Sequence, residues 1–338
     1  MGSFRFFVLL LVAVGLSVAS HPDRPASAQE TPPPEPTLQE RFDALDQKVR
    51  ILERNAELDK EGAAARATDA SSVSAGGKDG LFTLQSADKS FKLRVGGYLQ
   101  ADGRFFLNDE NPARSNTFLL RRVRPVLEGT VFKYYDFRIM PDFGGGTATL
   151  QDAYVRLSYW PQARLQFGKF KSPVGLERLQ SGTALLFVER GLPTNLVPNR
   201  DVGAQLDGDL GSGAFTYAIG VFNGVTDGGS ADTEPSSNDG KDVAARIFAH
   251  PFKATEVESL QGLGVGIAGS FGHQQGTQAA PNLPTYRTPA QQTLFSYAGA
   301  VAATGTTPAV PAVTADGTLT RLSPQAYYYR GPFGMLGE

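Results

Sequence analysis

Charged side chains alternate with apolar ones through residues 118–200, and this pattern limits the possible folds more than any other feature. The segment opens with Phe-Leu-Leu-Arg-Arg-Val-Arg-Pro (118–125) and continues through Asp-Phe-Arg-Ile (136–139) and Tyr-Val-Arg-Leu (154–157). A period of two residues is typical of β-strands with one charged face and one apolar face. Such strands fit a soluble sandwich with the apolar face inside, or a membrane barrel with the apolar face outside. The pattern alone does not decide between them.

Five successive strands are predicted with arginine on the polar face. They are expected at residues 97–107, 118–132, 136–143, 151–160 and 163–167. The arginines on their polar faces are Arg104, Arg122, Arg124, Arg138, Arg156 and Arg164, and the apolar faces include Leu119, Val123, Val155 and Leu157. Short turns at 133–135 and 161–162 would make these strands neighbours, so the guanidiniums would form a continuous row, partly compensated by acidic residues. The alternative is the solvated face of a soluble sheet, where Arg/Asp pairs are also common.

The composition excludes several classes of site. The chain of 338 residues has no cysteine and three histidines far apart, which leaves little material for a thiolate metal site or a histidine-based triad. No apolar run beyond the N-terminus reaches the roughly 20 residues that a membrane-spanning helix needs. If the chain crosses a membrane, it crosses as strands.

The rest of the chain also has the pattern of a β protein. Weaker strands are predicted at residues 204–210, 214–222, 242–250, 263–271 and 317–329. Long polar connections at 223–241 and 274–293 contrast with the short turns. Short turns at one end of the strands and long loops at the other are typical of outer-membrane barrels. We count about ten or eleven strands and expect the barrel to be incomplete at Glu338, because an open edge in lipid would leave backbone groups unpaired.

Positive charge is concentrated in the middle of the chain. Residues 81–200 hold 17 Lys and Arg against 10 Asp and Glu, whereas residues 201–338 hold 6 against 12. This excess would attract anions. Because the arginines lie on strand positions without an RNA-binding motif, we do not expect a nucleic-acid partner.

The N-terminal region divides into four expected parts before the β domain at 81–338. Residues 1–28 read as a signal peptide, residues 29–36 as a Pro-rich spacer and residues 62–80 as a flexible linker. Residues 37–61 are predicted to form a coiled coil, with a lone amphipathic helix as the alternative. Its seam is spaced 4, 3, 4, 3, 4 along Leu38, Phe42, Leu45, Val49, Leu52 and Ala56.

Several motifs together resemble the phosphate-selective porin O and P family over approximately residues 80–275. They are the 118–125 segment with Glu128-Gly-Thr, Met-Pro-Asp-Phe-Gly (140–144), Leu-Gln-Asp-Ala-Tyr (150–154), Gly-Lys-Phe-Lys (168–171) with Gly-Leu-Glu-Arg (175–178), Glu189-Arg190, Asn-Leu-Val-Pro-Asn-Arg (195–200) and Gly-Val-Phe-Asn-Gly (220–224). The set is specific as a whole.

The resemblance implies an all-β, transmembrane antiparallel barrel of sixteen strands, trimeric in the outer membrane of a Gram-negative cell, with the coiled coil in the periplasm. It implies a passive porin, without cofactor or catalysis, whose arginine-lined lumen and inward-folded constriction loop prefer inorganic phosphate or other small anions. Outer-membrane lipid and two further copies of the chain would be its partners. The residues that match the family's ladder and constriction are Arg122, Arg124, Asp152, Arg178, Ser181 and Arg190. With the strand arginines Arg138, Arg156 and Arg164 they complete the candidate anion-binding set.

Two positions depart from the phosphate-specific members of that family. The position matching Arg178 is lysine there, and the position matching Gly182 is serine, so this chain lacks one hydroxyl donor. Anion passage is therefore implied more firmly than phosphate selectivity. Arginine suits an anion filter because its planar fork binds oxyanions and keeps its proton. Asp152 would either shorten anion residence or orient an arginine, and the segment 171–200 would be either the constriction loop or an ordinary external loop.

Two other functions remain open from the sequence. A barrel hydrolase would need a nucleophile with a positioned base, and neither His250 nor His273 stands in such a motif. A non-conducting structural or adhesive barrel would share the same strand pattern. Conductance in planar bilayers distinguishes both from a porin.

Overall fold

The computed structural model describes residues 38–70, 74–78, 81–107, 115–231, 239–304 and 308–338. The expected signal peptide (1–28) and Pro-rich spacer (29–36) lie outside the described residues. The chain divides into two compact units, Met1–Ala64 and Ala65–Glu338.

A single long helix, α1 (Leu38–Ala70), covers the region of the predicted coiled coil. Its seam is open to solvent, with Phe42 66%, Leu45 63% and Leu52 67% exposed. The helix runs past residue 61 into the segment expected as a flexible linker, because Ala63-Ala-Ala-Arg-Ala has a high helix propensity. Residues 74–78 of the same segment form a paired strand. The association of α1 with other helices stays a prediction.

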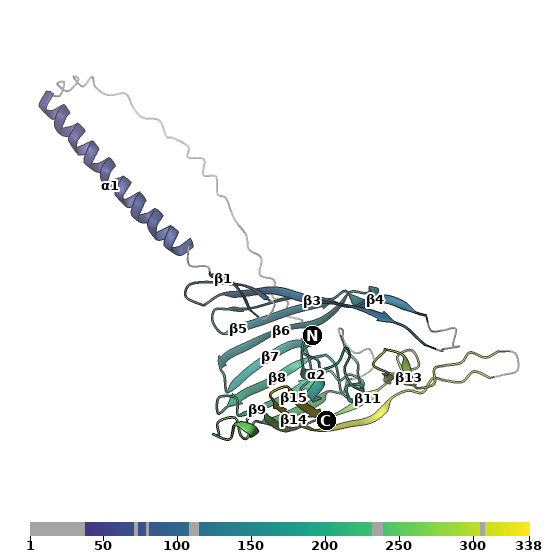
Figure 1. The fold of residues 1–338 in the computed structure, drawn as a ribbon. Coiled ribbons are helices and arrows are strands. Elements are labelled where there is room, and N and C mark those ends of the chain that lie inside the picture. The colour runs from purple at the N-terminus through teal and green to yellow at the C-terminus, as the bar shows by residue number, and fades with distance from the viewer. Residues whose placement is uncertain (1–37, 71–73, 79–80, 108–114, 232–238, 305–307) are drawn as a thin grey trace. The chain divides into compact units, whose positions relative to one another are not determined.

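The second unit is built on one antiparallel sheet of thirteen strands (Figure 1), in the order β1-β2-β3-β4-β5-β6-β7-β8-β9-β10-β11-β14-β15. The strands are β1 (Ser74–Lys78), β2 (Leu81–Gln85), β3 (Lys92–Arg104), β4 (Thr117–Val131), β5 (Tyr135–Asp142), β6 (Thr149–Trp160), β7 (Ala163–Phe170), β8 (Asp201–Leu210), β9 (Phe215–Phe222), β10 (Asp242–Ala249), β11 (Leu263–Gln275), β14 (Asp316–Arg330) and β15 (Phe333–Gly337). A separate hairpin, β12 (Thr285–Arg287) with β13 (Thr293–Ser296), lies between β11 and β14 in the chain.

Strands that follow one another in the sequence of the main sheet also pair with one another, and all the pairs are antiparallel. This confirms the mostly β, antiparallel fold class. The ten strands predicted between residues 97 and 329 all occur, with ends shifted by a few residues. Among the described residues β1 and β15 pair with one neighbour each and not with one another. The sixteen-stranded closure therefore stays a prediction.

The connections alternate in length along the sheet, as predicted. Trp160 pairs with Ala163 across a two-residue turn, and Arg330 pairs with Phe333 in the same way. The other ends of the strands are joined by longer segments that hold the short helices η1 (Gly144–Gly146), α2 (Leu176–Leu179) and η2 (Leu192–Leu196). One connection at the short-turn end is also extended, around η3 (Glu258–Leu260). The long segments thus gather at one end of the sheet.

The two faces of the sheet differ in chemistry in the predicted sense. Val155 and Leu157 are 51% and 38% exposed, whereas Arg122 is 2% exposed. The register aligns apolar side chains into a row that crosses seven strands on the exposed face: Phe137, Val155, Phe167, Ala204, Val221, Val243 and Phe271. The apolar face is therefore the outside of the sheet, and the charged face is the inside. A soluble sandwich would have reversed these exposures.

Candidate functional site

The segment 171–200, which joins β7 to β8, lies against the charged face of the sheet. The sheet curves so that β3 and β14 lie on opposite sides of α2, which belongs to this segment (Figure 1). We call residues 171–200 the inner loop. It is much longer than the two-residue turns, and it fills part of the space that the curved sheet surrounds.

A small apolar cluster fixes one side of the inner loop to the sheet. Val174, which is fully buried, and Val197 pack against Phe170 of β7, Phe222 of β9 and Ala244 of β10. The rings of Phe170 and Phe222 meet edge to face, with centroids 5.5 Å apart. Each fully buried side chain of this size stabilises the packing by about 1.5–3 kcal/mol. The cluster therefore positions the loop although the surrounding face is polar.

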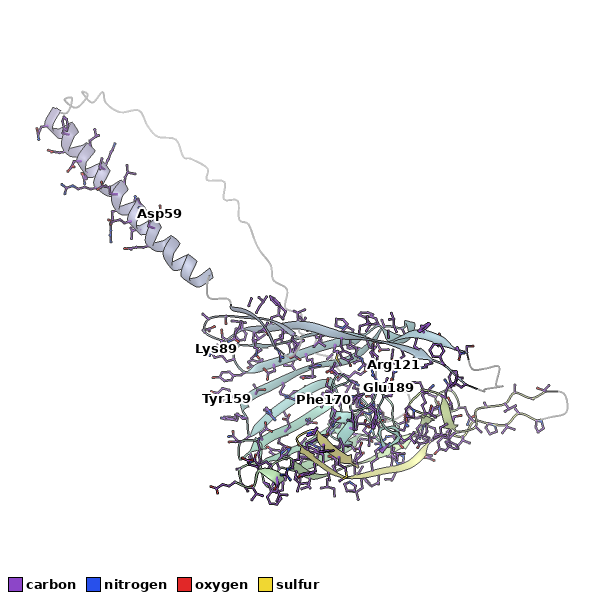
Figure 2. The ribbon with its side chains drawn as sticks, viewed as in Figure 1. Asp59, Lys89, Arg121, Tyr159, Phe170 and Glu189 are labelled. Atoms are coloured by element: carbon purple, nitrogen blue, oxygen red, sulfur yellow. The ribbon has the colours of Figure 1, made fainter. Side chains whose placement is uncertain are left out.

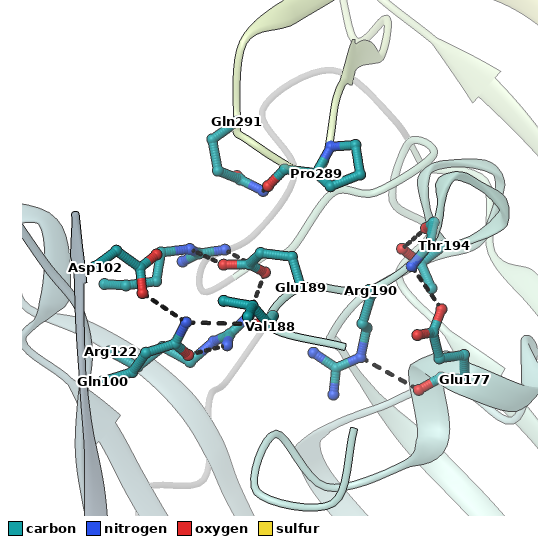
Figure 3. Close-up of polar contacts among 12 residues, drawn as sticks. Gln100, Asp102, Arg122, Glu177, Val188, Glu189, Arg190, Thr194, Pro289 and Gln291 are labelled. Carbon is teal, nitrogen blue, oxygen red and sulfur yellow. Dashed lines mark hydrogen bonds and ion pairs between the residues drawn. The ribbon is translucent and has the colours of Figure 1, made fainter. Parts of the chain in front are cut away.

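Glu189 fixes the other side of the inner loop to β4. Its carboxylate accepts hydrogen bonds from Nε of Arg121 at 2.5 Å and from Nη2 of Arg122 at 2.6 Å. Arg121 and Glu189 lie side by side in Figure 2, and Figure 3 draws the contacts of Glu189 with guanidinium groups as dashed lines. Gln100 of β3 accepts from Arg122 and donates to the carbonyl of Val188 at 3.5 Å. The loop is thus held at a carboxylate shared by two arginines.

A β-bulge explains how two consecutive residues of one strand reach the same carboxylate. Gln100 pairs with Arg122 and Ala101 pairs with Leu120, so Arg121 is an extra residue in β4. A bulge interrupts the alternation of side chains and re-aims one of them. Strict alternation would have put Arg121 on the apolar outer face, which is why the sequence did not single it out.

Two arginines of the inner loop have no carboxylate within ion-pair distance among the described residues. Arg178 donates to the carbonyl of Thr194, and Arg190 donates to the carbonyls of Glu177 at 3.2 Å and Gln180 at 2.7 Å. Burial and neighbouring arginines lower the pKa of Arg178 to about 9 and that of Arg190 to about 10. Both guanidiniums therefore stay charged at neutral pH, and no carboxylate of the described residues forms a direct ion pair with either.

Lys171 adds a titratable cation beside them. Its Nζ donates to the carbonyls of Leu179 at 3.3 Å and Gln180 at 2.7 Å. Burial, with further lowering by Arg200 and Arg190, brings the pKa of Lys171 to about 6. The amine is therefore mostly neutral at pH 7 and gains its charge below pH 6.

Five other arginines, four on the sheet and Arg200 just before β8, are by contrast largely neutralised by carboxylates. Their carboxylate partners come from a neighbouring strand or from the next strand but one. The pairs are Arg124–Asp142 at 2.7 Å, Arg138–Glu128 at 2.6 Å, Arg156–Asp207 at 3.8 Å, Arg164–Asp207 at 2.6 Å and Arg200–Asp152 at 3.0 Å. Arg178 and Arg190 of the inner loop thus differ from these arginines, because backbone carbonyls and not carboxylates hold them.

Two cavities open on either side of the inner loop. The larger, of about 540 Å³, includes Lys171, Ser181 and Gly182 of the loop and residues of β3 and β5 to β10. The smaller, of about 340 Å³, includes Arg178 and Arg190 and, from the β12–β13 hairpin region, Arg287. Arg200 lines both cavities. The boundary between them therefore lies at Arg200 and the inner loop.

Comparison with protein families gives one match to this chain. The model of the family described as phosphate-selective porin O and P matches residues 91–334, which include β4 to β14, the inner loop and both cavities. The chain belongs to this family. It is accordingly an outer-membrane porin by family. A search of the curated proteins gave no match.

Every residue of the predicted anion-binding set lines one of the two cavities of this porin. Five line the larger cavity: Arg138, Asp152, Arg156, Arg164 and Ser181. Four line the smaller cavity: Arg122, Arg124, Arg178 and Arg190. The geometry thus brings the set together on one face of the sheet, while its role in anion binding stays a prediction. Asp152 pairs with Arg200 at 3.0 Å and with Arg138 at 3.3 Å, so in this structure it orients arginines.

Sequence reasoning missed five cations that line the cavities. Arg200, Lys171 and Arg246 line the larger one, and Arg121 and Arg287 line the smaller one, with Arg200 shared. Arg200 and Lys171 lie inside motifs that support the family resemblance, and that position was a usable signal. Arg246 lies on the polar face of β10, and its guanidinium lies 4.4 Å from the ring centroid of Phe248. Arg121 was missed because the bulge breaks the alternation of side chains, and no strand pattern indicated Arg287.

No group of three or more His, Cys, Asp and Glu residues in the described part of the chain is arranged to hold a metal ion. Among the helices of the described residues, none combines the length and the apolar character of a membrane span.

Proposed function

We propose that this porin is a passive diffusion channel that prefers small anions, with inorganic phosphate as the class of solute it fits best. The charged inner face would line an aqueous lumen, and the exposed apolar face would contact outer-membrane lipid. The inner loop would be the constriction. The observation that supports this proposal is the pair of charged arginines, Arg178 and Arg190, which line the smaller cavity without a carboxylate in ion-pair contact among the described residues.

An anion filter needs cations that attract the ion and also release it. Arginines that are already ion-paired offer little net charge, so the sheet arginines would mainly shape the wall. Arg178 and Arg190 are held in place by backbone carbonyls instead. Their fixed positive charge is thus available to a passing anion, and the guanidinium geometry suits the oxygens of phosphate.

The assembly expected from the sequence completes the proposal. Closure of the sheet into a barrel would pair both of its edges, since an open edge in lipid leaves backbone groups without partners. Three copies would associate, with their α1 helices packed along the exposed seam in the periplasm. No catalytic step is part of the function.

The test is the ion selectivity of the full-length porin in planar bilayers. We expect a reversal potential under a salt gradient that reports an anion preference, and we expect the double variant R178Q/R190Q to lower the anion-to-cation permeability ratio about tenfold or more. R178K/R190K should keep most of the preference because it keeps both charges.

Arg330 provides the control. It is an exposed arginine at the short-turn end of β14 that lines neither cavity, so R330Q removes a charge without touching the inner loop. An unchanged permeability ratio in R178Q/R190Q would contradict the proposal. The alternative of a non-conducting structural barrel predicts no conductance in any variant.

A further inference from the structure

Tyr98 of β3 stands at the boundary between the two cavities and is not among the residues that the family resemblance pointed to. It lies directly opposite Arg124 of β4 in the strand register. Its hydroxyl oxygen accepts a hydrogen bond from Nη1 of Arg124 at 2.8 Å. Tyr98 lines the larger cavity and Arg124 lines the smaller one. One hydrogen bond therefore joins the linings of both cavities.

The inner loop approaches the Tyr98 hydroxyl at Gly182. A Cβ atom at position 182 would lie 2.7 Å from Oη and 3.3 Å from Cζ of Tyr98. Contacts under 3.0 Å are sterically forbidden for real Cβ atoms, so any side chain at 182 would displace the tyrosine or the loop. The phenol therefore occupies the space that a side chain at 182 would need.

The hydroxyl of Tyr98 can still donate. Its oxygen is the acceptor in the contact with Arg124, and no acceptor for its hydrogen is found among the described residues. The neighbouring hydroxyl of Ser181 is already engaged with Thr183 at 2.9 Å. Tyr98 thus offers a hydroxyl donor on the lining of the larger cavity, which it shares with Arg200.

We infer that Tyr98 is a specificity-determining residue that donates its hydroxyl to an oxygen of a tetrahedral oxyanion, such as phosphate, as the ion passes the inner loop at Gly182. This inference rests on the proposed anion channel and adds a residue to it. A tetrahedral oxyanion can accept from the phenol and from a guanidinium through different oxygens. Chloride is a single atom, so two donors at separate positions stabilise it less than they stabilise a tetrahedral oxyanion with several oxygens.

The experiment compares phosphate with chloride in the full-length porin. Phosphate is titrated against the chloride current in planar bilayers, and the half-inhibiting phosphate concentration is measured for wild type and for Y98F, which removes only the hydroxyl. We expect this concentration to rise about tenfold in Y98F, the size of one lost hydrogen bond to a charged group. The chloride conductance should stay within about twofold, because the ring keeps its place.

A second pair of variants tests the steric part independently. G182S in the presence of Tyr98 should lower the conductance of both ions, because the added side chain meets Oη at 2.7 Å. Y98F/G182S should regain both conductance and phosphate inhibition, because the phenol oxygen is gone and the serine returns a hydroxyl donor to the same space.

The outcomes separate this inference from the proposed function. A wild-type porin without anion preference would overturn the proposed function. An anion-preferring wild type whose phosphate inhibition is the same in Y98F would overturn the role of Tyr98 alone, as would equal losses of phosphate inhibition and chloride conductance. Phosphate-specific loss in Y98F with recovery in Y98F/G182S supports it.

Discussion

Glu189 accepts a 2.6 Å hydrogen bond from Arg122, across a separation of 67 residues in the chain. The same carboxylate also binds Arg121 of the bulge in β4. Glu189 is therefore an internal anion that both anchors the inner loop and occupies two guanidiniums. In the proposed channel, an anion in the smaller cavity would have to compete with Glu189 for those donors.

Replacing Glu189 by glutamine should raise the anion preference of the porin. The change keeps the shape but removes the negative charge, so Arg121 and Arg122 would add positive charge to the smaller cavity. The reversal potential in a salt gradient should move toward the anion limit, with a permeability ratio increased by about threefold to tenfold.

The control for this prediction is E256Q, which removes the same charge from an exposed residue outside both cavities. A permeability ratio in E189Q that equals the wild-type value, or that falls, would show that Glu189 does not oppose anion passage. Increased protease cleavage of the inner loop in E189Q would report the lost anchor separately.

Lys171 should make the anion preference depend on pH. Burial and the neighbouring arginines bring its pKa to about 6, so the amine is neutral above pH 6 and positive below it. Lowering the pH from about 8 to about 5 should therefore increase the permeability ratio for anions, with a midpoint near the pKa.

The variant K171Q should flatten this pH profile around pH 6, since glutamine can still donate to the carbonyls of Leu179 and Gln180 but does not titrate. Other groups that titrate in this range should contribute equally in both proteins, so the difference between the two profiles reports Lys171. An identical midpoint near pH 6 in wild type and K171Q would assign the transition to another group.

Gly168 of β7 should not tolerate alanine. Its φ of +122° lies in a region that favours glycine, and a Cβ there would come within 2.2 Å of the carbonyl oxygen of Ala153 on β6. We expect G168A to destabilise the sheet by about 1–3 kcal/mol or more through backbone strain. The measurement is the temperature at which the folded porin loses its compact form in detergent gels.

Gly299 supplies the comparison for this variant, since nothing lies within 4 Å of a Cβ built on it. G299A should unfold at the wild-type temperature. Equal unfolding temperatures for G168A and G299A would mean that β6 and β7 approach each other less closely than the structure has them.

The strands were predictable because each has one chemical signature per face. In β6, the alternation of Asp152, Tyr154 and Arg156 with Val155 and Leu157 identified both the strand and its polar side. The helix was less well bounded. The alanines after residue 61 lack an apolar seam, so periodicity ended before the helix did, while local propensity continued it to Ala70.

The residues of the site were predictable, but their charge state was not. Parity and the family motifs found Arg122, Arg178 and Arg190, yet nothing local to Arg122 shows that Glu189 neutralises it from the inner loop. The sequence placed Arg178 and Arg190 on the loop, but it did not show that their ionic partners differ from those of the sheet arginines. Their difference arises from tertiary contacts, since they meet carbonyls where the others meet carboxylates.

The exposed seam of α1 should hold copies of the porin together. Phe42, Leu45 and Leu52 are each more than 60% exposed on the isolated helix, with Val49 at 45% between them. Side chains of this size at coiled-coil spacing are stabilised by packing against the same seam of other copies. If the protein is the trimer proposed above, deleting residues 37–61 should lower the temperature at which the detergent-solubilised assembly dissociates, measured by light scattering. The variant L45E/L52E should do the same by burying charge in the seam.

The control is D43N/E57Q, which changes exposed positions away from the seam and should dissociate as wild type does. A deletion that leaves both the mass and the dissociation temperature unchanged would show that α1 does not hold copies together.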